Sequence, residues 1–236
     1  MKNSHLPPKY CWVSYKRQLW ASVCYGLGCV SAPLTQLGEL CSNFAFDSLS
    51  FFGVNRNIRA SWRYLPTVFG SCGLFSLSTE CVIALLNLLL QHWLAPSMVS
   101  KSLSCSMEYL QLEAGFASCL LSEPFDPMGP LCMHSWVRSL WESIQTYNLD
   151  VDLEYPTIPP HRKNDVLLST LSISGGIHGT HLESFRRCHV ASNELYLSCL
   201  ASANGRLLDP TCGQPVVDYS ATSTYDFLQE RPSQED

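Results

Sequence analysis

The strongest apolar run in the chain covers residues 81–90, CVIALLNLLL, and continues through QHWLA to residue 95. A helix that spans a bilayer needs about 20 apolar residues. This run reaches about 15 residues at its longest, and Asn87, Gln91 and His92 interrupt it. We therefore expect a buried core helix here and no membrane partner, with membrane association through residues 81–94 as an alternative.

Apolar spacing, prolines and glycines predict further helices on both sides of this run. Ser78 is expected to cap a helix over 79–94, and Thr180 and Glu183 match a capping box. The other expected helices cover 15–24, 33–52, 98–113 after an N-cap at Ser97, 132–147, a short piece from 164 or 165 to 171, and 180–201. Alternation over 150–155 predicts a short strand, and Asn204-Gly205 predicts a turn beside another strand at 206–209. The expected fold class is mainly α with a few short β-strands, in an irregular helical bundle.

Charge is distributed unevenly along the chain. Residues 1–101 hold eight Lys/Arg and three acidic residues, whereas residues 102–236 hold seven and seventeen. Such a division suggests a part that faces a polyanion and a part that is solvated, although dispersed surface charge accounts for the same numbers. We expect an aromatic and basic thumb-like segment over 1–76, a helical accessory domain over 77–213 and a disordered tail over 214–236.

Twelve cysteines occur at irregular spacing, and no CxxC pair is among them; they are residues 11, 24, 29, 41, 72, 81, 105, 119, 132, 188, 199 and 212. Most lie inside apolar stretches, where a free thiol behaves as a small hydrophobic group. The first ten residues contain no apolar segment typical of a secretory signal. These features predict reduced, structural cysteines and an intracellular location.

Histidines and cysteines of the C-terminal half are candidate zinc ligands. His178 and His181 have HxxH spacing, and Cys188, His189 and Cys199 follow. Zinc needs three or four converging ligands. The glycine-rich loop and the capping box account for His178 and His181 without a metal, so we expect no metal and no cofactor.

Acidic residues offer a second kind of chemistry. Asp150 and Asp152 would share one face of the expected strand, as in two-metal sites, but the solvent face of an amphipathic strand explains the same alternation. We expect Glu113 at an exposed helical position, which is the commoner case, with a buried acid as the alternative. With no nucleophile motif and no phosphate-binding loop in the sequence, an enzyme is not expected.

The best local signal for nucleic-acid contact lies in FGVNRNIRASWRYLP, residues 52–66. Arginines contact phosphates, and aromatic rings stack on unpaired bases. The candidate nucleic-acid-binding residues are therefore Arg56, Arg59, Arg63 and Trp62. Packing of these side chains on a domain surface remains the alternative.

The same region carries a resemblance to a known family. Gly53, Asn55 and Arg56 fit a G-x-N-R segment, and Pro66, Gly70, Gly73 and Leu74 fit a following P-x-x-x-G-G-x-G-L segment, from which Ser71 and Cys72 depart. Further matching segments follow in order at 91–92, 106–115, 135–142, 162–166, 185–188 and 200–209. Over roughly residues 10–212 the chain resembles the region that follows the polymerase domain in reverse-transcriptase-like retroelement proteins.

The resemblance implies a thumb-like and accessory region without catalytic residues. The polymerase metal site of that family contains an Asp-Asp pair, and this chain has none. The resemblance places the polymerase domain upstream of Met1 and implies RNA or an RNA–DNA hybrid as the ligand. The expected function is that of a non-catalytic remnant with an ancestral role in template–primer contact; the alternative is a structural or interaction protein without nucleic-acid binding.

Overall fold

The structure is a computed structural model that describes residues 7–155, 157–160, 162–192 and 194–201. Helices dominate, and the described β-pairing is an antiparallel bridge between Leu167 and Tyr196. The predicted mainly α class is therefore confirmed. Contacts divide the chain into a first unit, residues 1–100 with 134–143, and a second unit, residues 101–133 with 144–236.

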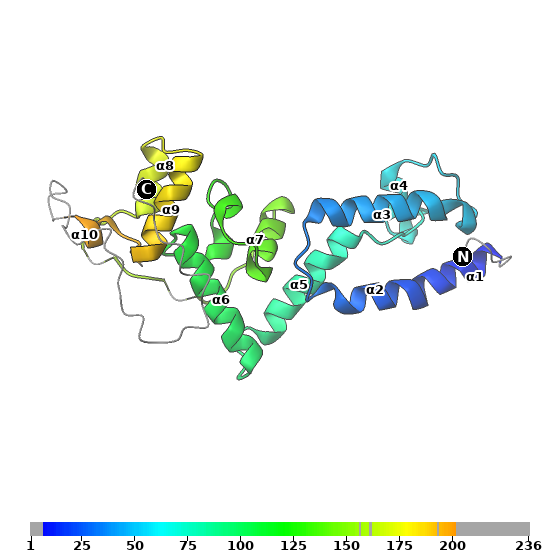
Figure 1. Ribbon diagram of the computed structural model, residues 1–236. Helices are drawn as coiled ribbons and strands as arrows, with labels where there is room; N and C mark the ends of the chain where they lie inside the picture. The colour runs from blue at the N-terminus through cyan, green and yellow to red at the C-terminus, as the bar shows by residue number, and fades with distance from the viewer. Residues whose placement is uncertain (1–6, 156, 161, 193, 202–236) are drawn as a thin grey trace. The chain divides into compact units, whose positions relative to one another are not determined.

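The first unit begins with one long helical stretch (Figure 1). It consists of α1 (Pro8–Ser14), a π-helical turn (Tyr15–Leu19) and α2 (Trp20–Leu27). Proline is tolerated at the first helical position because its missing N–H would have no partner there. The helix therefore starts at Pro8, about two turns before the start predicted at residue 15.

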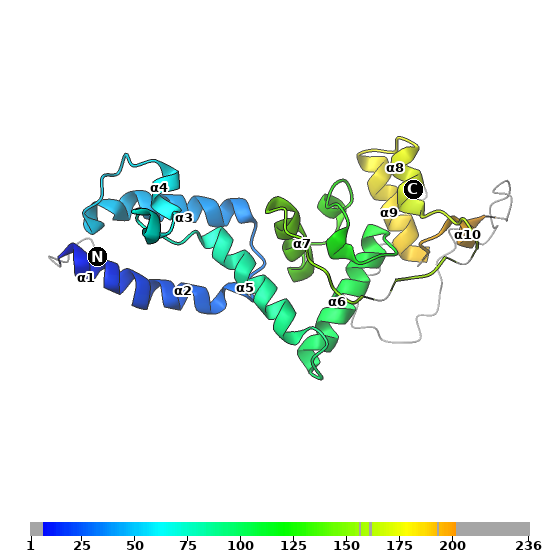
Figure 2. The same cartoon turned by 180° about the vertical axis from the view of Figure 1, so that it is seen from behind.

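Helices α3 (Leu34–Ser48) and α5 (Leu77–His92) complete the frame of this unit. A 3₁₀ turn (Leu49–Phe52) extends α3, and Gly53 ends it with a φ of 74°. Helix α5 packs against both α2 and α3 (Figures 1 and 2). It buries Cys81, Val82, Leu85 and Leu89, which confirms the predicted core helix.

The start of α5 corrects one prediction. Its N-cap is Ser76, whose hydroxyl accepts a hydrogen bond from the Thr79 backbone N–H at 3.5 Å. Ser78 lies inside the helix, and its hydroxyl is 3.0 Å from that of Ser76. None of the helices in the described part of the chain is long and apolar enough to cross a membrane.

An aromatic cluster forms the core between α1, the turn after α3 and the segment before α5. Tyr15 is 1% exposed and lies at its centre. Five neighbouring rings lie within 6.3 Å of its ring, measured between centroids; they belong to Trp12, Trp20, Phe44, Phe52 and Phe75. Such ring pairs stabilise a fold beyond the area they bury, so the cluster fixes the position of the N-terminal helix.

Helix α6 (Met98–Ala114) begins and ends where the sequence predicts. The Ser97 hydroxyl accepts from the Ser100 N–H at 3.2 Å, and Gly115 follows the helix with a φ of 78°. Helix α7 (Trp136–Thr146) starts later than the predicted residue 132. The Ser135 hydroxyl accepts a hydrogen bond from the Arg138 N–H at 3.2 Å, and this cap fixes the start of α7.

The C-terminal helices differ from prediction because a β-bridge interrupts them. They are α8 (Leu168–Ser174), α9 (Thr180–Ser192) and α10 (Leu197–Leu200). The Leu168 N–H donates to the Leu195 carbonyl and the Leu197 N–H donates to the Val166 carbonyl, both at 2.9 Å. A single helix over 180–201 was thus a wrong prediction, as was the 164/165 N-cap: the Asp165 carboxylate instead accepts from the Ser198 N–H at the start of α10.

Two other local predictions are wrong. Residues 150–155 form no regular strand, and the described β-pairing involves Leu167 and Tyr196 instead. The predicted capping box is replaced by an ion pair, in which the Glu183 carboxylate accepts two bonds from Arg186, at 2.8 and 3.0 Å. The predicted turn at 204–205, the strand at 206–209 and the tail at 214–236 lie outside the described residues.

Helix α5 belongs to the first unit, so the compact units do not coincide with the predicted boundary between residues 76 and 77. Compactness and independent folding are different properties. The division into a thumb-like segment and an accessory domain therefore stays a prediction.

Candidate nucleic-acid interface

Two of the predicted arginines make hydrogen bonds to residues close to them in the sequence. The Arg63 guanidinium donates from Nε to the Ile58 carbonyl at 3.1 Å and from Nη2 to the Arg56 carbonyl at 3.2 Å. Arg56 in turn donates from Nη2 to the Ser50 hydroxyl at 3.2 Å. Arg63 is half-buried and braces the loop, so it is placed for structure more than for ligand contact.

Arg59 and Trp62 face outward. Arg59 occupies the N-cap position of α4 (Ala60–Tyr64) with its side chain exposed, and the Trp62 ring is 46% exposed. They lie three residues apart in the sequence, Arg59 directly before the helix and Trp62 inside it. Of the four predicted residues, the structure thus leaves these two most accessible to a ligand.

A loop over residues 65–74 follows α4 and is tied to this helix by backbone bonds. The Cys72 N–H donates to the Trp62 carbonyl at 3.0 Å and the Leu74 N–H to the Arg63 carbonyl at 2.8 Å. Gly73 has a φ of 60°, and a Cβ there would lie 2.6 Å from Thr67 Cγ2. The loop therefore has one tightly packed conformation, with an apolar tip formed by Leu65, Val68 and Phe69, which are 42%, 88% and 67% exposed.

Between this loop and the N-terminal helix lies an open hollow of about 740 Å³, here called the cationic groove. Lys9, Lys16 and Arg17 line its helical side, together with Trp12, and residues of the loop line the other side. None of the described lining residues is acidic. A groove of this charge concentrates phosphate groups.

Sequence reasoning missed this groove because it placed the start of the helix at residue 15. The signal was present: Lys9, Trp12, Lys16 and Arg17 stand at spacing i, i+3, i+7 and i+8, which is one face of a helix that begins at Pro8.

The groove wall is held by stacked rings. Trp12 stacks on Phe52 with a centroid separation of 4.3 Å and an interplanar angle of 24°. The Lys16 Nζ lies 5.8 Å from the centroid of the Trp12 ring, a cation–π distance. The cations are therefore arranged on a rigid support.

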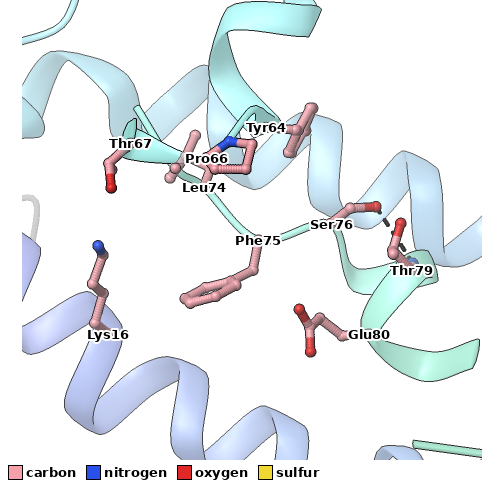
Figure 3. Close-up of a pocket in the computed structure, with 10 residues that line it drawn as sticks. Lys16, Tyr64, Pro66, Thr67, Leu74, Phe75, Ser76, Thr79 and Glu80 are labelled. Carbon is pink, nitrogen blue, oxygen red and sulfur yellow. Dashed lines mark hydrogen bonds between the residues drawn. The ribbon is translucent and has the colours of Figure 1, made fainter. Parts of the chain in front are cut away.

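A second hollow, of about 390 Å³ and here called the side pocket, adjoins the groove (Figure 3). Lys16 and Glu80 reach toward it from opposite sides, and the Phe75 ring lies between them. Tyr64, Pro66 and Leu74 form its wall, and Ser76 and Thr79 at the start of α5 supply hydroxyl groups. Burial, followed by its contact with Cys41, raises the pKa of Tyr64 to about 12, so this hydroxyl stays neutral at ordinary pH.

The other candidate sites of the sequence are less organised. Among the residues whose side chains are described, no group of three His, Cys, Asp or Glu lies close enough to hold a metal. The ten described cysteines are free thiols. Burial raises the pKa of Cys81, and also that of Cys72, where Arg63 opposes the effect.

Glu113 is buried, at 0% exposure, so the exposed position expected for it is wrong and the alternative holds. It pairs with Arg186 and accepts from the Met133 N–H at 2.9 Å, so its carboxylate serves packing within the second unit.

Comparison with protein families, with curated proteins and with solved structures finds no match for this chain.

Proposed function

We propose that this chain is a non-catalytic protein that binds nucleic acid through its first unit. The observation that carries the proposal is the cationic groove, in which Lys9, Lys16 and Arg17 line one hollow free of described acidic residues. Phosphate neutralisation by such cations supplies most of the affinity of sequence-independent binding.

The resemblance to reverse-transcriptase-like proteins suggests the identity of the ligand and the origin of the chain. RNA or an RNA–DNA hybrid is the proposed ligand, and an upstream polymerase domain of a parent polyprotein is the proposed partner. Arg59 and Trp62 would extend the contact beyond the groove, because both side chains are exposed, at the N-cap and within α4.

A second candidate is an interaction protein without a nucleic-acid role. The apolar tip formed by Leu65, Val68 and Phe69 favours it, because contiguous exposed apolar side chains mark protein contacts. The use of Arg56 and Arg63 within their own loop points the same way.

Salt-dependent binding of the full chain distinguishes the two candidates. Fluorescence anisotropy with labelled single-stranded RNA and with an RNA–DNA hybrid would be recorded between 25 and 200 mM salt (roughly the range over which phosphate contacts weaken). Three phosphate contacts predict a slope of log K against log salt of about −2. The interaction protein predicts no salt-sensitive binding, and that result would overturn the proposal.

A matched pair of variants locates the site. K9Q/R17Q removes two charges from the groove, and K101Q/K163Q removes two charges from exposed lysines of the second unit. The first variant should lower the magnitude of the slope by about 1.4, and the second should leave it unchanged. Equal losses in both variants would place binding outside the groove.

A further inference from the structure

The cationic groove and the side pocket are neighbouring hollows that share two lining residues. Lys16 and Thr67 line both. A ligand that crosses the groove with its phosphates beside Lys9, Lys16 and Arg17 therefore lies against a residue, Lys16, that also lines the side pocket.

The size and lining of the side pocket fit a single small, flat group. Its volume of about 390 Å³ falls within the range of ordinary small-molecule sites, about 300–1,000 Å³. Phe75, Leu74 and Pro66 offer apolar surface, and the hydroxyls of Ser76 and Thr79 lie at the α5 end. Base surfaces stack on aromatic side chains in single-stranded complexes.

The two charged groups, Lys16 and Glu80, make the two ends of the pocket electrostatically different. Lys16 attracts phosphate at the end shared with the groove, and Glu80 repels it from the far end. A carboxylate accepts hydrogen bonds only, so Glu80 selects a group that donates N–H or O–H. A nucleobase or a sugar carries such donors, whereas a phosphodiester carries none.

The floor of the pocket is fixed before any ligand arrives. The Phe75 N–H donates to the Tyr15 hydroxyl at 3.4 Å, and the Cys41 thiol donates to the Phe75 carbonyl, also at 3.4 Å. Phe75 stacks on Trp20 with centroids 4.9 Å apart. A preformed site binds more tightly because less ordering is needed on binding.

From these relationships we infer that the side pocket receives one unpaired nucleoside from a strand whose backbone lies in the cationic groove, with a donor group of that nucleoside on Glu80. The inference rests on the proposed function and makes it more specific: the ligand is single-stranded, since a base held in a duplex cannot leave it without cost.

The test compares three labelled probes of equal length on the full chain: a mixed-sequence single strand, its duplex and an abasic single strand. The abasic strand keeps the phosphates and removes every base. The base-bearing single strand should bind about tenfold more tightly than either of the others, the effect of one stacked base. Adenosine monophosphate should displace the single strand at lower concentration than ribose 5-phosphate does, a measurement that needs no variant.

Glu80→Gln is the matched variant, and Glu39→Gln on the exposed face of α3 is its control. Each removes one negative charge, so any general gain in affinity is common to both. The ratio of affinities for base-bearing and abasic strands should fall about threefold or more in E80Q and stay constant in E39Q.

The outcomes separate the inference from the proposed function. No binding of any probe would overturn both. Salt-sensitive binding that is equal for base-bearing, abasic and duplex probes would leave the proposed function in place and overturn the inference. An unchanged ratio in a folded E80Q would likewise overturn it.

Discussion

The Arg186 guanidinium donates to the Glu113 carboxylate across 2.7 Å, and the two side chains are 7% and 0% exposed. The bond joins α6 to α9 within the second unit. Burial lowers the pKa of Arg186, but hydrogen bonds to Glu183 and the charge of Glu113 outweigh it, so the pKa lies above its usual range. The pair therefore stays ionised although it is removed from water.

Loss of one partner should destabilise the second unit. Glu113→Gln leaves the buried Arg186 guanidinium with Glu183 as the carboxylate partner that remains of the two. Breaking a buried ion pair costs about 3 kcal/mol. Urea unfolding would show this as a lower free energy of unfolding. Glu108→Gln, on the exposed part of the same helix, is the control and should change it by less than about 0.5 kcal/mol. Equal effects of the two variants would contradict a role for the pair.

The first unit should lose stability at alkaline pH. Burial raises the pKa of Tyr15 from 10.0 to about 12, and a raised tyrosine pKa stabilises the fold below pH 10 and ceases to do so as pH rises toward 12. At pH 11 the free energy of unfolding should be about 1.4 kcal/mol lower than at pH 8 from this residue alone.

Tyr15→Phe should remove that part of the pH dependence. Tyr25→Phe is the control, because the Tyr25 ring is 95% exposed and meets the same solvent in both states. Unfolding by urea at pH 8 and pH 11 would test both variants. A Y15F profile as steep as that of the unchanged chain would contradict the assignment.

The stability of the loop over 65–74 should depend on Gly73. Gly73→Ala combines a φ of 60° with a Cβ only 2.6 Å from Thr67 Cγ2, so we expect a loss of about 2 kcal/mol or more. Gly38→Ala in the middle of α3 meets nothing within 4 Å and should gain about 0.5 kcal/mol. Thermal unfolding distinguishes the two, and a neutral G73A would indicate a looser loop.

Substitution of Arg63 should affect mainly the stability of the fold, and substitution of Arg59 should affect mainly nucleic-acid binding. Arg63→Ala removes two bonds to loop carbonyls and should lower the free energy of unfolding by about 1–2 kcal/mol. Arg59→Ala should leave stability within about 0.5 kcal/mol and weaken nucleic-acid binding. Urea titration would measure the stability of both variants, and anisotropy would measure their affinity for nucleic acid. A larger loss of affinity in R63A than in R59A would indicate that Arg63 contacts the ligand directly.

Local rules predicted the helices with clear end signals. Ser97 and Gly115 delimit α6 as expected, because a hydroxyl cap and a left-handed glycine act within one turn of chain. Long-range pairing was beyond such rules. The bridge between Leu167 and Tyr196 ends α9 early, and Glu183 turns to Arg186 instead of capping its own helix.

The candidate site has the same limit: local sequence signals point to some of its residues, and long-range packing brings in the others. Interleaved arginines and aromatic residues predicted Arg59, Trp62 and Arg63 as ligand contacts. The structure leaves the first two exposed, and it shows Arg63 bound to two nearby carbonyls, which the local pattern does not indicate. The groove residues Lys9, Lys16 and Arg17 face residues 67–72 across the fold, and no local pattern relates those two segments.

The bridge between Leu167 and Tyr196 closes the segment that contains α8 and α9 at both ends. A segment closed in this way opens as one cooperative unit, because release of either end frees the other. Amide hydrogen exchange should therefore give the protected amides of α8 and α9 a common opening free energy, separate from that of the aromatic cluster around Tyr15.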